Sequence, residues 1–327
     1  MRTLIISGYG VRIRFRDGVF VIENRGLKKT VPPMSIDQLV IATGGVSITS
    51  KAIRKAMSLG IDVVFLNSRG EPVGRIYPVY INRTVETRRM QYRAFNTFKR
   101  YDVVNAIIYA KITNQAGLLK RYYYITRDKY VREGYTEILS IRDKELPVKD
   151  TRDFNEEIME IEARAARIYW STYSLLIPKD YGFDSRDQDG ADPVNILLNY
   201  GYGLLYKEVW RSLVLAGLDP YAGFLHTDRS GKPVLVFDFI EQFRFIVDLI
   251  VLRLLRKKWK PVIDGGLLSW DSRRYFIERI EEFLEKEKTT YYTSHPVTIR
   301  QAMKKAAFQL AAFLRDEALF KGFIYDW

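Results

Sequence analysis

The sequence lacks cysteine altogether and contains only two histidines among its 327 residues. The missing cysteines exclude disulfide bonds and thiolate-bound metal sites, and they are typical of proteins from a reducing compartment. Of the two histidines, His226 lies in a turn-rich segment, whereas we interpret His295 as structural. Any site chemistry must therefore come mainly from carboxylates, amides, hydroxyls and basic groups.

Long uninterrupted apolar runs are also missing. The most apolar stretch, FIEQFRFIVDLIVLRLL, is broken by Glu241, Arg244, Asp248 and Arg253, whereas a membrane span needs roughly 20 consecutive apolar residues. It predicts a core helix. The N-terminus shows no apolar run followed by a small-residue cleavage site, as a signal peptide would have. We therefore expect a soluble, cytoplasmic protein with no membrane contact.

Basic residues, in contrast, are in excess. The chain has 52 Lys and Arg against 39 Asp and Glu, a formal net charge of +13. Such an excess usually indicates a polyanionic partner, either nucleic acid or an anionic membrane surface. Aromatic residues make up 14% of the chain, which suits base contacts and a well-packed core equally well.

The apolar pattern changes along the chain. Residues 1–85 contain short alternating runs such as VRIRFRDGVFVIE, which predicts a hairpin around Asp17-Gly18. The segment SKAIRKAMSLG predicts a helix with Ser50 as its N-cap. Beyond residue 86 the apolar residues recur every three or four positions, which predicts helices over 86–126, 153–177, 193–216, 238–260, 271–288 and 296–319. We expect an α+β fold: an N-terminal β-rich domain (1–85) followed by a large, mainly α-helical domain (86–327).

One carboxylate falls within an apolar helical stripe. Glu162 shares a face with Ile158, Ala165, Tyr169 and Tyr173, because these residues follow one another at three- or four-residue spacing. An unpaired carboxylate in such a stripe is costly. Either Glu162 pairs with an arginine at the edge of the stripe, or it is a buried metal ligand.

A second set of polar groups lies around His226. This residue belongs to the loop-like segment AGFLHTDRSGKP, and Asp238 and Glu241 follow in an apolar run, after a VLVF stretch expected to be extended. Asp238 and Glu241 can be the N-cap and N3 residues of a capping box. Alternatively, Glu241 points along the apolar side of the helix towards His226. Two glutamates and one imidazole suit Mn²⁺ or Mg²⁺.

Two further groups of residues are candidates for supporting roles. Asn195, Asn199 and Tyr202 form a polar stripe, which indicates either hydrogen bonds between helices or orientation of metal ligands or a substrate phosphate. The segment RLLRKKWK clusters basic residues around Trp259, and a second basic cluster spans residues 83–100. Each can be a solvated helix face, but both together in a basic protein favour phosphate contacts, which position DNA without reading its sequence.

Four ordered motifs carry a family resemblance. EARAARIYW, DPVNILLNYGYGLL, AGLDPYAGFLH and FDFIEQFR resemble the CRISPR-associated integrase/endonuclease family Cas1, the large subunit of the spacer-acquisition complex. The segments LIISGYGVRI, IDQLVIATGGVSITSKAI, GIDVVFLNSRGEPVGRIYP and ETRRMQY are similar as well, so the resemblance covers essentially the whole chain. One departure is FDSRDQDGADP, acidic apart from Arg186, where many relatives have an Arg/Pro-rich loop; it argues against a DNA contact from this loop.

The resemblance implies specific roles. Glu162, His226 and Glu241 correspond to the family's divalent-metal ligands, with Mg²⁺ or Mn²⁺ as the cofactor, and Asp238 to a supporting acid, so that these four form the catalytic set. Asn195 and Asn199 would support them. We expect DNA contacts from Arg244, Arg256, Lys257, Lys258 and Lys260.

The resemblance also implies partners and a reaction. The N-terminal domain would form a homodimer that acts with a small ferredoxin-like CRISPR adaptation partner, Cas2, on double-stranded protospacer and CRISPR-repeat DNA. A 3′-hydroxyl of the incoming DNA would attack a phosphodiester of the repeat, and water in its place would give endonuclease activity. The alternatives are a stand-alone metal-dependent DNA nuclease in repair and a non-catalytic DNA-binding scaffold.

Overall fold

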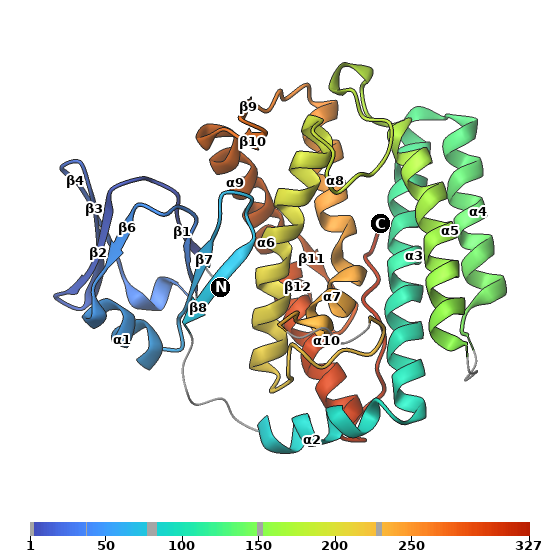
Figure 1. Cartoon of the computed structure of the whole chain (residues 1–327), viewed down its shortest axis with the longest axis horizontal. Helices are drawn as coiled ribbons and strands as arrows, with labels where there is room; N and C mark the ends of the chain where they lie inside the picture. Colours follow the sequence, from blue (N-terminus) through green and yellow to red (C-terminus); the bar gives the residue numbers. More distant parts are fainter. Residues whose placement is uncertain (1–2, 37, 77–83, 149–152, 227–230) are drawn as a thin grey trace.

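The computed structural model describes residues 3–36, 38–76, 84–148, 153–226 and 231–327. Strands dominate up to Ile76 and helices dominate from Thr84 (Figure 1). The expected α+β architecture, with N-terminal strands and a helical remainder, is confirmed. The boundary predicted near residue 85 adjoins residues 77–83, which lie outside the described residues.

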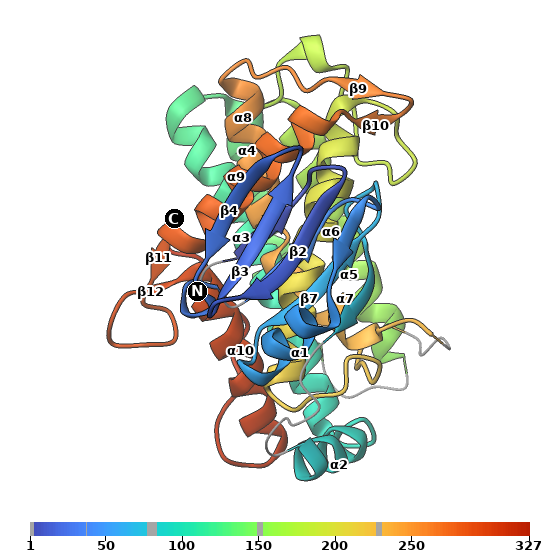
Figure 2. The same ribbon diagram turned by 90° about the vertical axis from the view of Figure 1, so that its left-hand side faces the viewer.

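The N-terminal part contains two four-stranded sheets. The first has the order β1-β5-β7-β8 and is parallel except for β8; the second has the order β4-β3-β2-β6. The strands are β1 (Thr3–Ile6), β2 (Val11–Arg16), β3 (Val19–Asn24), β4 (Leu27–Val31), β5 (Gln38–Ile41), β6 (Val46–Ile48), β7 (Asp62–Leu66) and β8 (Pro72–Ile76). Turned by 90°, these sheets lie in front of the helical part (Figure 2).

The hairpin and the helix predicted for this part are both present. Strands β2 and β3 form the predicted hairpin, and Asp17 and Gly18 both adopt positive φ angles, 50° and 79°, as a type I′ turn requires. Helix α1 (Ser50–Ser58) begins one residue earlier than expected, because Thr49 is its N-cap and accepts from the Ala52 N–H at 3.3 Å. The prediction of Ser50 as N-cap is therefore wrong by one position.

The remainder consists of packed helices with short irregular connections. The helices are α2 (Thr84–Ala94), α3 (Phe98–Thr126), α4 (Lys129–Glu145), α5 (Phe154–Ser174), α6 (Pro193–Leu215), α7 (Val234–Ile240), α8 (Phe245–Arg256), α9 (Trp270–Lys286) and α10 (Ile299–Leu314). Short 3₁₀ turns are η1 (Pro33–Ser35), η2 (Lys179–Tyr181) and η3 (Glu241–Phe243); the strand pairs are β9 (Ile263–Asp264) with β10 (Leu267–Leu268), and β11 (Lys288–Thr289) with β12 (Val297–Thr298). Helices α3, α4 and α5 run side by side at one end of the molecule (Figure 1).

Three helix predictions need correction. The helix expected over 86–126 is two helices, α2 and α3, because Thr97 is extended between them. The helix expected over 238–260 is α7, η3 and α8, and the VLVF stretch expected to be extended is the first turn of α7. Helix α4 was not predicted. No proline or glycine marks the break between α2 and α3 or the break between α7 and α8, so tertiary packing decides these two boundaries.

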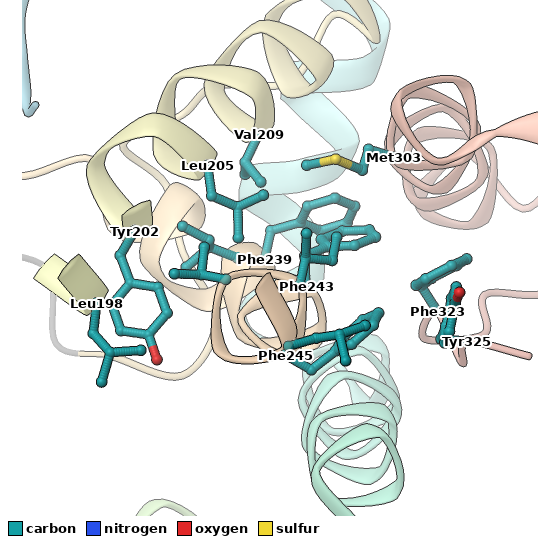
Figure 3. Packing of buried hydrophobic residues seen from close by; sticks show 14 of the residues in the cluster. Leu198, Tyr202, Leu205, Val209, Phe239, Phe243, Phe245, Met303, Phe323 and Tyr325 are labelled. Carbon is teal, nitrogen blue, oxygen red and sulfur yellow. The ribbon is translucent and has the colours of Figure 1, made fainter. Parts of the chain in front are cut away.

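The main core lies between α6, α7, α8 and the C-terminal segment. Phe239, Phe243 and Phe245 lie within it (Figure 3); Phe243 and Phe245 stack on Phe323 from the chain end, and Phe239 packs against Phe243. The rings of Phe243 and Phe323 are stacked with centroids 5.2 Å apart. This packing ties the helices that carry the candidate site to one another. Within the described parts of the chain, no helix has the length and apolarity needed to cross a membrane.

A buried ionic network joins the two parts of the molecule. The Asp62 carboxylate on β7 lies 2.6 Å from an Arg75 nitrogen on β8 and 3.0 Å from Arg211 Nε on α6. Close by, Gly203 of α6 leaves room for the turn after β7: a Cβ added there would lie 2.6 Å from the Gly70 carbonyl oxygen. The sheet that contains β7 and β8 therefore packs directly against α6.

Candidate active site

Glu162 lies on the buried face of α5. Ile158, Ala165, Tyr169 and Tyr173 are fully buried, and the side chain of Glu162 is 21% exposed. The predicted apolar stripe is thereby confirmed, with the one carboxylate partly accessible at its edge. Because its neighbours on the stripe are packed, the direction of the Glu162 side chain is fixed by the helix.

Asp238 organises the loop that carries His226. It lies within α7, is 1% exposed, and accepts at Oδ2 from the backbone N–H groups of Phe224 (2.6 Å) and Leu225 (3.0 Å). Its Oδ1 accepts from the backbone N–H of His226 at 3.2 Å and lies 2.6 Å from His226 Nδ1. The capping-box interpretation is wrong, because α7 begins at Val234, four residues before Asp238.

Gly223 makes this loop geometry possible. A Cβ at this position would lie 2.7 Å from Asp238 Oδ2 and would collide with Val234. The glycine of the GFLH motif is thus required by the close approach of the loop to α7.

His226 is held at one ring nitrogen, and no hydrogen bond from the described residues reaches the other. Its Nδ1 contacts Asp238, while its side chain remains 42% exposed. The hydrogen bond with Asp238 raises the pKa of His226. A carboxylate at Nδ1 favours the tautomer with a proton there, which leaves the Nε2 lone pair free, and metal-binding histidines are commonly oriented in this way. The neighbouring residues 227–230 lie outside the described residues.

Glu241 is the most strongly perturbed carboxylate of the set. Its residue is 6% exposed; Arg244 Nε donates to Oε1 at 2.8 Å, and Lys111 Nζ lies 2.5 Å from Oε2. Burial opposes ionisation, but Arg244 and Lys111 outweigh it and lower the pKa of Glu241 to about 2. Glu241 is therefore an anion at neutral pH.

Lys111, on α3, is the residue that sequence reasoning missed. Its ammonium forms ion pairs with Glu162 and with Glu241, and the residue is 8% exposed. Burial disfavours the charged form, yet the two carboxylates raise the pKa of Lys111. The sequence pattern that could have identified Lys111 is a charged residue among apolar helical positions, here Ile107, Ile108 and Ile112 of α3. The same pattern singled out Glu162.

The C-terminal segment fixes α3 against η3 next to this ion pair. Asn114, one turn beyond Lys111, donates through Nδ2 to the carbonyl oxygens of Gln242 (3.0 Å) and Phe323 (2.8 Å). Gln242 Oε1 in turn accepts from the Phe323 N–H at 2.7 Å. Lys111 lies one turn before Asn114, and Glu241 directly precedes Gln242, so these side-chain-to-backbone hydrogen bonds help to set the separation of Lys111 and Glu241.

The predicted ligands surround a cation, but that cation is an ammonium group. Glu162 and Glu241 both contact Lys111, and both lie near enough to His226 to raise its pKa. Across the described stretches, no three His, Asp or Glu groups are gathered tightly enough to hold a metal ion as they stand. Two carboxylates that already share one cation, with an imidazole nitrogen nearby, nevertheless form a donor set that fits Mg²⁺ or Mn²⁺.

Asp248 joins the helices behind the site. It is 1% exposed and accepts from the hydroxyls of Tyr169 (2.7 Å) and Tyr202 (2.5 Å), while the Tyr173 hydroxyl donates to its backbone carbonyl at 2.8 Å. Burial raises the pKa of Asp248 to about 6. Since Tyr169 lies two turns beyond Glu162 on α5, this cluster positions α5 against α8.

Asn195 and Asn199 bind a loop, which neither of the two interpretations above had foreseen. Asn195 Oδ1 accepts from Arg186 (2.9 Å) and from the Asp187 N–H (3.0 Å), and its Nδ2 donates to Ser185 O and Asp192 Oδ2. Asn199 Oδ1 accepts from Arg186 at 2.6 Å. Both asparagines therefore hold the segment 185–188, so they contribute to the shape of the surroundings.

This segment borders a cavity of about 650 Å³, whose lining includes Arg244, the ion-pair partner of Glu241. Arg69, Arg186, Tyr202 and Arg244 are among its lining residues. The guanidinium groups of Arg244 and Arg186 lie 4.7 and 5.7 Å from the centroid of the Tyr202 ring. The side of the site next to Glu241 is thus cationic.

The other predicted DNA-binding residues lie at the far end of α8. Arg256 donates to the Leu176 carbonyl at 3.2 Å and its guanidinium lies 5.5 Å from the centroid of the Tyr122 ring, whereas Lys257, Lys258 and Lys260 are exposed. Arg244, in contrast, belongs to the candidate site through Glu241.

Solved structures place the fold in a class of integration and CRISPR-associated proteins. A structure titled "Casposase bound to integration product" matches with a TM-score of 0.82 at 25% identity, covering 98% of this chain and 92% of the other. A CAS1 protein from Thermotoga maritima has the same fold, with a TM-score of 0.78 at 21% identity over 98% of this chain and 99% of the other.

Sequence comparisons define the family. The model for "CRISPR associated protein Cas1" matches residues 4–282. A "CRISPR-associated endonuclease Cas1 2" of Saccharolobus solfataricus is 36% identical, covering 99% of this chain and 98% of its own length. The "CRISPR-associated endonuclease Cas1" of Hyperthermus butylicus is 35% identical, with 98% of each chain covered. The chain belongs to the Cas1 family.

Proposed function

We propose that the protein is the integrase of CRISPR adaptation, a divalent-metal-dependent DNA endonuclease and strand transferase. The observation that carries the proposal is the convergence of Glu162 and Glu241, from separate elements, on one cation, beside a histidine braced by Asp238. Relatives named CRISPR-associated endonucleases and a casposase bound to an integration product support the same reaction class.

Each residue has a chemical task in this proposal. Glu162, Glu241 and the free Nε2 of His226 would hold Mg²⁺ or Mn²⁺, which when bound polarises the phosphoryl oxygen and stabilises charge in the transition state. Asp238 keeps the proton on Nδ1, so that Nε2 stays available. Arg244, held by Glu241, adds positive charge to the lining of the cavity.

The bond changes balance without a further cofactor. The 3′-hydroxyl of the incoming strand gives up its proton as its oxygen bonds to the phosphorus of a repeat phosphodiester, and the displaced oxygen takes up a proton and leaves as a new 3′-hydroxyl. One phosphodiester forms for each one broken, and no covalent protein intermediate is needed. When water attacks instead, the outcome is strand cleavage.

The proposed substrate is double-stranded DNA of the protospacer and the repeat. The net charge of +13 and the exposed Lys257, Lys258 and Lys260 support phosphate contacts that weaken as salt rises. The family also supports a homodimer that acts with Cas2. In the N-terminal part, Tyr9, Leu27 and Met34 have 74%, 79% and 92% exposure, as residues awaiting a partner surface would.

The test is strand transfer by site variants. We expect Glu162→Ala and His226→Ala to abolish Mn²⁺-dependent joining of a DNA 3′-end to repeat DNA, while DNA binding persists, because binding depends on basic surface groups. His295→Ala, which removes the other histidine, is the matched control.

The products separate the rival functions. Branched, joined DNA indicates an integrase, and simple cuts alone indicate a stand-alone nuclease. Undiminished transfer by the purified Glu162 or His226 variant would overturn the assignment. Salt-sensitive binding without any metal-dependent reaction would indicate a scaffold.

A further inference from the structure

Lys111 gives the candidate site an internal cation. Its side chain, 10% exposed, extends from the middle of α3 to a point where its ammonium pairs with both Glu162 and Glu241. The two carboxylates come from α5 and η3, so the lysine is the group that joins the three elements. A buried ammonium is tolerated only with such compensation.

The charges of the four neighbouring groups balance. Glu162 and Glu241 carry two negative charges, and Lys111 and Arg244, which is bound to Glu241, carry two positive ones. A divalent cation added to this set would leave a surplus of positive charge in a partly buried place. Such a surplus is costly unless a cation leaves or an anion enters.

We infer that Lys111 is the counter-ion of the site, that it competes with the divalent cation for Glu162 and Glu241, and that the metal and a DNA phosphate consequently bind cooperatively. This inference rests on the proposed metal-dependent function. The phosphate supplies the negative charge that the metal leaves unbalanced, and it offers the displaced ammonium a new partner.

Substitution of Lys111 by a neutral residue should strengthen metal binding and not weaken it. Removing a group that merely held the site together would weaken metal binding. Removing a competing cation strengthens it, because Glu162 then loses the ammonium with which it pairs and Glu241 keeps only Arg244. We expect Lys111→Met to bind Mn²⁺ more tightly than the wild type, by between about 5- and 150-fold, the usual range for coupling between two binding events.

The experiment is calorimetric titration of Mn²⁺ into DNA-free protein, repeated with short duplex DNA present. Lys99→Met is the matched control, since Lys99 lies on the same helix, is 12% exposed and pairs with Asp316 away from the site. Its Mn²⁺ affinity should equal that of the wild type. Lys111→Arg keeps the cation and should not show the tightening.

DNA supplies the second measurement. We expect duplex DNA to tighten Mn²⁺ binding to the wild type, and Mn²⁺ to tighten DNA binding by the same factor, because coupling is reciprocal. In Lys111→Met the factor should be smaller, since the surplus positive charge is smaller by one unit.

Folding of the variant does not limit the test. Lys111→Gln is a second neutral variant whose amide can still donate to a carboxylate, and it should also show tighter Mn²⁺ binding. A larger Mn²⁺-induced rise in melting temperature than in the wild type reports the same change in affinity.

Equal or weaker Mn²⁺ binding by both neutral variants would overturn the role of Lys111 and leave the proposed function intact. Absence of Mn²⁺ binding in every protein, with and without DNA, would instead refute the metal-dependent function.

Discussion

At the scale of single residues, Asp238 holds the loop that carries His226 through several contacts of one carboxylate. One carboxylate receives three backbone N–H groups and contacts the imidazole of His226. All of these donors come from one loop, so the carboxylate fixes both the path of the backbone and the ring orientation. The sequence motif identified Asp238 as important, but its role as the anchor of a loop depends on contacts across 12 to 14 positions of the chain.

We predict that Asp238→Asn impairs both stability and activity. The amide nitrogen of asparagine cannot accept, and each buried donor left without an acceptor costs about 1–3 kcal/mol in unfolding free energy. Misorientation of His226 should lower Mn²⁺-dependent strand transfer by about 10- to 100-fold. Urea denaturation and a transfer assay measure the two effects, with the exposed Asp184→Asn as control. A variant that is destabilised yet fully active would show that Asp238 does not orient His226.

At the scale of secondary-structure elements, Asp248 holds three helices together. Tyr169 and Tyr173 reach it from α5 and Tyr202 from α6, while Asp248 itself is on α8. The pattern of the sequence placed Tyr169 and Tyr173 on the face of Glu162 but could not show that they meet Asp248. Among the described residues the carboxylate accepts hydrogen bonds from tyrosine hydroxyls and from no cationic side chain, and its burial raises its pKa.

We predict a pH dependence of stability that depends on Asp248. Burial raises the pKa of Asp248 from 3.8 to about 6 in the folded protein, so the folded state binds the proton more tightly than the unfolded state does. The stabilisation is therefore complete below about pH 4 and is lost as the pH rises through 6. At about 1.4 kcal/mol for each pKa unit, it amounts to about 3 kcal/mol.

The measurement is the difference in unfolding free energy between the wild type and Asp248→Asn from pH 4 to pH 7. This difference isolates Asp248, because Glu241 and Glu208, whose pKa values are lowered to about 2, titrate in both proteins. We expect the unfolding free energy of the wild type to fall relative to that of Asp248→Asn as the pH rises. A constant difference across this range would contradict the raised pKa.

At the scale of the whole molecule, the junction between sheets and helices is ionic and close-packed. Asp62 pairs with Arg75 in its own sheet and with Arg211 on α6. The network continues on α6, where Lys207 pairs with Glu281 of α9 and Glu208 with Arg300 of α10. The sheet therefore rests on the same helix that carries Tyr202 towards the site.

We predict that Asp62→Ala destabilises the protein by about 3–5 kcal/mol, because it removes the carboxylate that pairs with two buried guanidinium groups. Glu23→Ala is the control, since Glu23 forms an exposed pair with Arg14 that should contribute about 0–1 kcal/mol. Thermal or urea unfolding measures both. Equal losses in the two variants would show that the network does not stabilise the junction.

Sequence alone determined the α+β order, the Asp17-Gly18 hairpin, the buried face around Glu162 and the family motifs, because these depend on local periodicity and on short contiguous segments. Tertiary structure alone decided that α7 begins before Asp238, that Asn195 and Asn199 hold the 185–188 segment, and that Lys111 joins Glu162 to Glu241. These features arise from contacts between residues far apart in the chain, where the balance between burial and charge is set by packing and by no local pattern.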